Sequence, residues 1–134
     1  MATGLPTFDA FSWASLLAGR QALVIDRSRG RGLALAAALE EAGAVVTLAP
    51  GQAIGVDRLG ERPFALVLLA LSEEEPVMER LVRQLAASPV PQLAVLGEPS
   101  RHALLRATFA GARIGDHSMG ARDLVLFLIG TPDE

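Results

Sequence analysis

Short apolar runs alternate with amphipathic stretches along most of the chain, and this alternation limits the possible folds more than any other feature. Runs with an apolar residue at almost every position are typical of parallel strands that are buried on both faces. Five such runs with short connections predict a doubly wound, five-stranded parallel sheet of the α/β class. The expected strands are QALVID (21–26), AVVTLA (44–49), FALVLLALS (64–72), PQLAVLG (91–97) and ARIGD (112–116).

The stretches between these runs predict the helices that cover the sheet, because their apolar residues recur at helical spacing. GQAIGVDRLGER (51–62) is less regular and predicts a weak helix or a loop. Three acidic residues, Glu73 to Glu75, stand where the helix after the third strand should begin, and the helix dipole favours negative charge there. Helices are expected over GLALAAALEEAG (32–43), EEPVMERLVRQLAAS (74–88), PSRHALLRATFAG (99–111) and ARDLVLFLIG (121–130).

The residues before the first strand predict an N-terminal extension. FDAFSWASLLAG (8–19) has apolar residues at roughly helical spacing and ends on a glycine that can close a helix. We expect Trp13 to pack this short helix on the domain. The predicted organisation is a tail and short helix at 1–20, one domain at 21–130 and a short tail at 131–134.

The residue types that are absent exclude several kinds of chemistry. All twelve basic residues are arginine, and the chain has no cysteine, lysine or tyrosine. Disulfides, cysteine-based zinc sites, thiol nucleophiles, Schiff-base lysines and P-loop lysines are therefore excluded. The net charge of -3 argues against general nucleic-acid binding, and no apolar run reaches the roughly 20 residues of a membrane span. We expect a cytoplasmic protein whose partners include neither nucleic acid nor membrane.

Ligands of a doubly wound sheet bind at the carboxyl ends of the strands. In this chain those ends are Asp26 and the segments 70–72, 96–97 and 115–119. The turn after the first strand, DRSRGRG (26–32), combines one carboxylate with three guanidinium groups, those of Arg27, Arg29 and Arg31.

The first strand, turn and helix weakly resemble the opening of short-chain dehydrogenases, whose turn reads T-G-x-x-x-G-x-G. Gly30 and Gly32 match this pattern, but Ile25 and Asp26 stand where its threonine and first glycine belong. An aspartate in place of that glycine would bring negative charge close to the pyrophosphate. The catalytic Tyr–Lys pair of the family cannot exist in this chain. An active dehydrogenase is therefore not expected, which leaves at most a nucleotide-binding remnant.

A more extensive resemblance covers residues 21–130, which are similar to the CheY-like receiver domains of two-component response regulators. ALVIDRSRGRGLALAAALEEAG resembles the opening of a receiver, FALVLLALS its third strand, VPQLAVLG its fourth, and AGARIGDHSMGARDLVLFLI its last strand and helix. The resemblance implies a flavodoxin-like, CheY-like (βα)5 fold with an extra N-terminal helix. In that family an acidic pair and an aspartate hold Mg²⁺, and that aspartate accepts a phosphoryl group from a histidine kinase.

The resemblance also implies that the phosphorylation pocket has degenerated. Asp26 matches the first acid of the pair, but its neighbour is Arg27. Ala70 stands at the phospho-accepting aspartate, Leu96 at the threonine or serine, and Ser118 at the lysine. The implied protein is a pseudo-receiver without enzymatic activity, bound metal or cofactor.

The implied partners are a histidine kinase or an output domain of the same bacterial pathway. LAGRQALVID (17–26) resembles the linker before the receiver of hybrid histidine kinases, so the chain could be one domain of a longer protein. The apolar last helix, DLVLFLIG (123–130), suggests a homodimer through the last helices.

The turn at residues 26–32 leaves two interpretations open. In the first, Asp26 pairs with Arg27 or Arg29 in an abandoned pocket. In the second, Arg27, Arg29 and Arg31 form an anion site at a helix N-terminus and bind an anionic nucleotide or a cyclic dinucleotide. For His117, in the loop after the last strand, we expect a structural or solvent-exposed position rather than a role as a ligand or phosphoacceptor.

Overall fold

Five parallel strands form one sheet at the centre of the computed structural model, which describes residues 14–129. The strand order is β2-β1-β3-β4-β5, so the chain reverses its direction of winding after β2. The predicted doubly wound parallel sheet is thereby confirmed. The strands are β1 (Gln21–Asp26), β2 (Val45–Ala49), β3 (Leu66–Ala70), β4 (Gln92–Leu96) and β5 (Arg113–Gly115).

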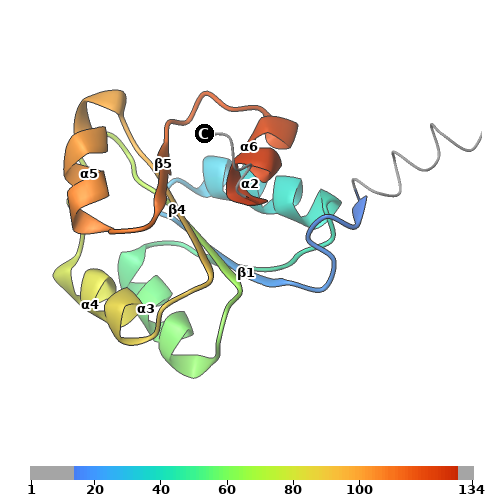
Figure 1. Cartoon of the computed structure of the whole chain (residues 1–134), viewed down its shortest axis with the longest axis horizontal. Helices are drawn as coiled ribbons and strands as arrows, with labels where there is room; N and C mark the ends of the chain where they lie inside the picture. Colours follow the sequence, from blue (N-terminus) through green and yellow to red (C-terminus); the bar gives the residue numbers. More distant parts are fainter. Residues whose placement is uncertain (1–13, 130–134) are drawn as a thin grey trace, which may run out of the picture.

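Helices cover both faces of the sheet, with α2 and α6 on one face and α3 and α4 on the other (Figure 1). The 3-10 turn η1 leads directly into α5. The bounds are α2 (Arg29–Glu41), α3 (Gln52–Glu61), α4 (Glu79–Ala87), η1 (Pro99–Arg101), α5 (His102–Thr108) and α6 (Ala121–Ile129). The segment expected to be a weak helix or a loop is thus a regular helix, α3.

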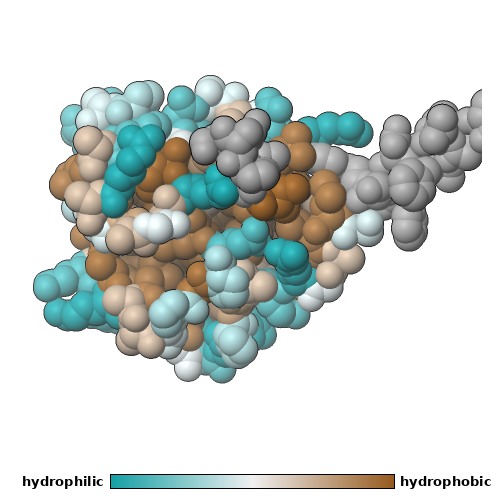
Figure 2. All heavy atoms as spheres, viewed as in Figure 1, coloured by the Kyte–Doolittle hydropathy of each residue, from teal (hydrophilic) through white to brown (hydrophobic). Residues whose placement is uncertain are grey.

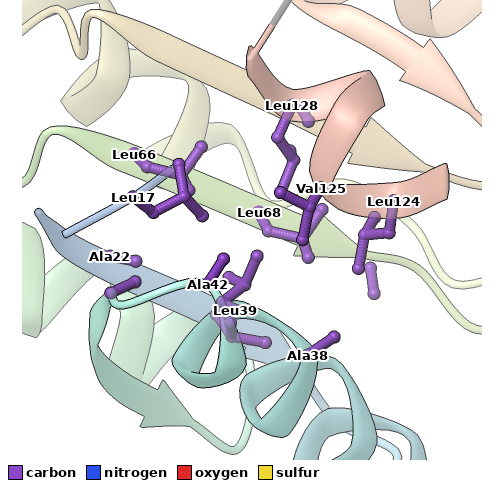
Figure 3. Packing of buried hydrophobic residues seen from close by; sticks show 14 of the residues in the cluster. Leu17, Ala22, Ala38, Leu39, Ala42, Leu66, Leu68, Leu124, Val125 and Leu128 are labelled. Atoms are coloured by element: carbon purple, nitrogen blue, oxygen red, sulfur yellow. The ribbon is translucent and has the colours of Figure 1, made fainter. Parts of the chain in front are cut away.

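Each face of the sheet carries its own hydrophobic core. Figure 3 shows the first core, in which Leu124, Val125 and Leu128 of α6 point toward β3, while Leu39 of α2 lies over β1. The second core joins the other face to α3, α4 and α5, whose contributions include Leu59, Leu81, Leu85 and Leu105. Alternate residues of one strand enter different cores, which explains why β1 and β3 are apolar at nearly every position.

The end of the predicted N-terminal helix packs into the first core, where Leu17 is fully buried. Trp13, expected to anchor this helix, lies outside the described residues. Gly43 follows α2 with a φ of 101°, and a Cβ built on it would lie 2.7 Å from the carbonyl oxygen of Ala14. This position therefore requires glycine, both for its left-handed backbone and for the close approach of the N-terminal segment.

The helix after β3 begins later than predicted. Its expected start was residue 74, whereas α4 begins at Glu79. Pro76 explains the difference, because a proline disfavours helical backbone at the residue before it. Glu74 has a φ of 61°, which is outside the helical region. Glu73 to Glu75 therefore do not form the first helical turn, and the acidic residue of that turn is Glu79.

The surface of the described residues mixes polar and apolar groups. Figure 2 shows hydrophobic residues across the middle of the face seen in Figure 1, between more hydrophilic borders. Among residues 14–129, no helix combines the length and the hydropathy needed to cross a bilayer. Large hydrophobic side chains with substantial exposure are those of Leu33, Val45, Leu104 and Leu126.

Candidate functional site

The carboxyl edge of the sheet brings the predicted site residues into one row. In the strand register Asp26 is paired with Ala70, Ala70 with Leu96, and Leu96 with Gly115. All of these except Gly115 are buried, with exposed fractions of 2% or less. Ala70 and Leu96 supply neither a carboxylate nor a hydroxyl group, so Asp26 is the only residue of this row that has a polar side chain.

The Asp26 carboxylate is bound by one edge of the Arg31 guanidinium group, formed by Nε and Nη2. Arg31 Nε donates to Oδ2 at 2.7 Å, and Arg31 Nη2 donates to Oδ1 at 2.7 Å. The backbone N–H of Ser28 also donates to Oδ1, at 2.8 Å. The Asp26 side chain is fully buried, whereas 26% of the Arg31 side chain is exposed. Its hydrogen bonds to Asp26 raise the pKa of Arg31 above its ordinary value.

The prediction that Asp26 pairs with Arg27 or Arg29 was wrong, because its partner is Arg31. Arg31 lies in the first turn of α2, next to Gly32, where a Cβ would lie 3.3 Å from the Cβ of Asp26. This close approach of helix and strand brings the Arg31 side chain over the end of β1. Arg27 precedes the helix and reaches the loop after β3 instead.

The Arg31 guanidinium group also contacts the loops that follow β3 and β5. Nη2 donates to Ser72 Oγ at 3.2 Å, and Nη1 lies 3.4 Å from His117 Nε2. His117 Nε2 is 2.8 Å from the carbonyl oxygen of Leu71, and a carbonyl can only accept. Nε2 must therefore carry the proton, which makes its approach to Arg31 a contact without a hydrogen bond. One side chain thus connects three loops at this edge.

A second buried carboxylate, Glu75, lies beside this group and was not recognised as a site residue from the sequence. Its Oε1 accepts the backbone N–H of Ser72 at 2.8 Å, and its Oε2 accepts Gln52 Nε2 at 2.8 Å. Arg27 Nε lies 3.4 Å from Oε1. Gln52 also donates to the carbonyl of Pro76 and accepts the N–H of Met78. Glu75 and Gln52 therefore fix the loop after β3 on the start of α3.

The two buried carboxylates at this edge each have a cationic partner within the chain. Two buried carboxylates, Asp26 and Glu75, face two guanidinium groups, Arg31 and Arg27. Within residues 14–129 no group of three or more histidine, aspartate or glutamate side chains could hold a metal ion. Mg²⁺ prefers free carboxylate oxygens, and three donors already occupy those of Asp26. The residues present therefore do not fit the magnesium site that the fold would otherwise imply.

Ser118, which stands at the position of the receiver lysine, contacts Asp116. Its Oγ donates to Asp116 Oδ1 at 2.5 Å, and its backbone N–H donates to the same oxygen at 3.0 Å. These bonds favour the charged carboxylate and lower the pKa of Asp116. Ser118 itself is exposed.

Ser118→Ala should raise the pKa of Asp116 toward the ordinary aspartate value, because the larger of the two hydrogen-bond contributions is lost. The remaining bond from the backbone N–H should keep the pKa below that value. The measurement is an NMR titration of the side-chain carboxyl carbon, with Asp57, an exposed aspartate on α3, as the internal control. An unchanged Asp116 titration would show that the hydroxyl does not bind the carboxylate in solution.

Comparison with known proteins identifies the fold and leaves the sequence family open. No protein-family model matches the chain, and no curated protein matches it. A response regulator from Burkholderia multivorans is 27% identical, with 86% of this chain and 95% of that chain covered and a TM-score of 0.63. A response regulator from Thermotoga maritima is 22% identical over 81% of this chain and 92% of that chain, with a TM-score of 0.67.

A CheY-like receiver domain from Methanospirillum hungatei is similar to the same extent. It is 18% identical over 81% of this chain and 90% of that chain, with a TM-score of 0.67. These neighbours share the five-stranded parallel sheet and the alternation of strands and helices found here. The chain therefore has the fold of the CheY-like receiver domains of response regulators.

Proposed function

We propose that the chain is a receiver domain that is not phosphorylated and that acts through protein–protein contact in two-component signalling. The observation that carries this proposal is the double hydrogen bond between Arg31 and Asp26. Asp26 is the one acid of the receiver pocket that the sequence retains. Its hydrogen bonds to Arg31 give it a permanent cationic partner within the chain.

Phosphoryl transfer in a receiver needs a nucleophilic carboxylate and cationic groups for the transferred group. Ala70 has no nucleophile, and Leu96 has no hydroxyl group for a phosphoryl oxygen. Ser72 Oγ accepts from Arg31 and has no base among its described contacts, so nothing there would activate it. The pocket therefore lacks the groups for phosphorylation. In their place, Arg31 contacts the three loops at this edge and keeps them in one arrangement.

Such a module would transmit its signal through its surface. Leu104 on α5 is 63% exposed and Leu126 on α6 is 41% exposed, so both helices offer apolar contacts on either side of β5. These side chains support a partner surface there, either for a kinase or output domain or for a second copy of the chain. Attachment to a hybrid histidine kinase remains part of this proposal.

The test is incubation with acetyl phosphate and Mg²⁺, followed by intact-mass measurement under conditions that preserve acyl phosphates. We expect no added phosphoryl group and no change of the melting temperature with Mg²⁺. The Thermotoga maritima response regulator, treated in parallel, checks that the reagent and the conditions are active. A phosphorylated species of this chain would contradict the proposal, and peptide mapping would then identify the acceptor.

A further inference from the structure

A pocket of about 270 Å³ lies between the start of α2 and the end of β2, outside the Asp26–Arg31 pair. Its volume is close to the lower limit for small-molecule sites. It is lined by Asp26, Arg27, Arg29, Leu33, Leu48 and Pro50. These residues divide into a charged wall and an apolar wall.

The charged wall is positive although it includes Asp26. That carboxylate has no exposed side-chain surface, and Arg31 neutralises it from the inner side. Arg29 is exposed and has no carboxylate partner among residues 14–129. Arg27 is 51% exposed in its side chain, and it contacts Glu75 through Nε at 3.4 Å. The pocket therefore presents two guanidinium groups, of which one is unpaired and the other is loosely paired.

The apolar wall consists of Leu33, Leu48 and Pro50. Leu33 is 51% exposed, which makes it one of the few large hydrophobic side chains that the described fold leaves in water. Covering Leu33 with a flat ring would remove apolar surface from water. Guanidinium groups bind phosphate and carboxylate through paired hydrogen bonds. The two walls together match a ligand with a ring at one end and an anionic group at the other.

We propose that this pocket binds a small anion that carries a flat aromatic ring system and a phosphate or carboxylate group. The ring lies on Leu33, Leu48 and Pro50, and the anionic group lies between Arg27 and Arg29. Arg31 takes no part, since it does not line this pocket and its Nε and Nη2 are directed to Asp26 and Ser72. A neighbouring pocket on the other side of Arg27 is less suitable, because the Glu75 carboxylate forms part of its lining and repels an anion.

The test is an NMR titration of the whole chain that follows the methyl groups of Leu33 and Leu48. Four probes separate the two parts of the ligand: adenosine monophosphate, benzoate, adenosine and inorganic phosphate. We expect saturable shifts from at least one ring-bearing anion, and binding at least tenfold weaker for adenosine and for inorganic phosphate. A preference for adenosine monophosphate would identify a nucleotide source, and a preference for benzoate an organic acid.

Two variants and one control locate the anionic group. Arg29→Ala and Arg27→Ala should each weaken the binding by about tenfold or more, because each removes a charge-assisted hydrogen bond. Arg106→Ala, on the exposed side of α5, removes the same charge far from the pocket and should leave the affinity unchanged.

Two outcomes would overturn this proposal: no saturable shift with either ring-bearing anion, or equal affinities in the Arg29→Ala and Arg106→Ala variants. Because the Asp26–Arg31 pair is intact in every variant, this result and the phosphorylation result are independent.

Discussion

Arg31→Ala should lower the free energy of unfolding by about 3 kcal/mol. The variant leaves the fully buried Asp26 carboxylate with the Ser28 N–H as its only remaining partner of the three. Breaking a buried ion pair from one side costs more than the pair contributes, because an uncompensated charge stays in the interior. The measurement is urea denaturation followed by far-UV circular dichroism.

Three further variants separate the ion pair from other effects. Arg31→Lys keeps the charge but loses the paired geometry, so it should recover only part of the stability. The double variant Asp26→Asn with Arg31→Met removes both charges and should be more stable than Arg31→Ala. Arg27→Ala should lower the free energy of unfolding by less than about 1 kcal/mol, because its contact to Glu75 is long and the Arg27 side chain is half exposed. Equal losses for Arg27→Ala and Arg31→Ala would contradict the assignment of Arg31 as the internal cation.

The fold could be predicted because local and global signals agree along the chain. β3 is buried at every position, and a run such as LVLLA has no polar face that would suit an exposed strand. The intervals between strand ends were also informative: Asp26, Ala70 and Leu96 are adjacent in the register, as the receiver resemblance implies. The acidic run does not mark the start of α4, because Pro76 disfavours helical backbone at Glu75 and α4 begins at Glu79.

The site could be predicted only in part, because side-chain directions in a turn depend on tertiary packing. The sequence indicates that Asp26 is neutralised by an arginine, but it offers three arginines at alternate positions. The choice of Arg31 depends on how closely α2 approaches β1 at Gly32. Glu75 and Gln52 are 23 positions apart, and no local pattern connects them. A proline directly after a glutamate was the one signal against a role for Glu75 in a helix terminus.

Ala70→Asp combined with Arg31→Ala should create a site for Mg²⁺ that neither change creates alone. The register places position 70 next to Asp26, so the new carboxylate and Asp26 would face the space that the guanidinium group leaves. In Ala70→Asp alone, Arg31 still occupies both oxygens of Asp26 and attracts the new carboxylate as well. In Arg31→Ala alone, the row contains a single acid.

The measurement is the melting temperature with increasing Mg²⁺, for the double variant and for each single variant. Mg²⁺ at about 100 times its dissociation constant would stabilise the double variant by about 2.7 kcal/mol, which corresponds to a rise of several degrees. The single variants and the unmodified chain should show no rise. An equal response of Ala70→Asp alone would mean that Arg31 does not block the metal, and that the missing acid at position 70 by itself accounts for the loss of the site. A response confined to the double variant would instead show that Arg31 blocks the metal. The double variant and Ala70→Asp both contain the two acids, and they differ only in the presence of Arg31.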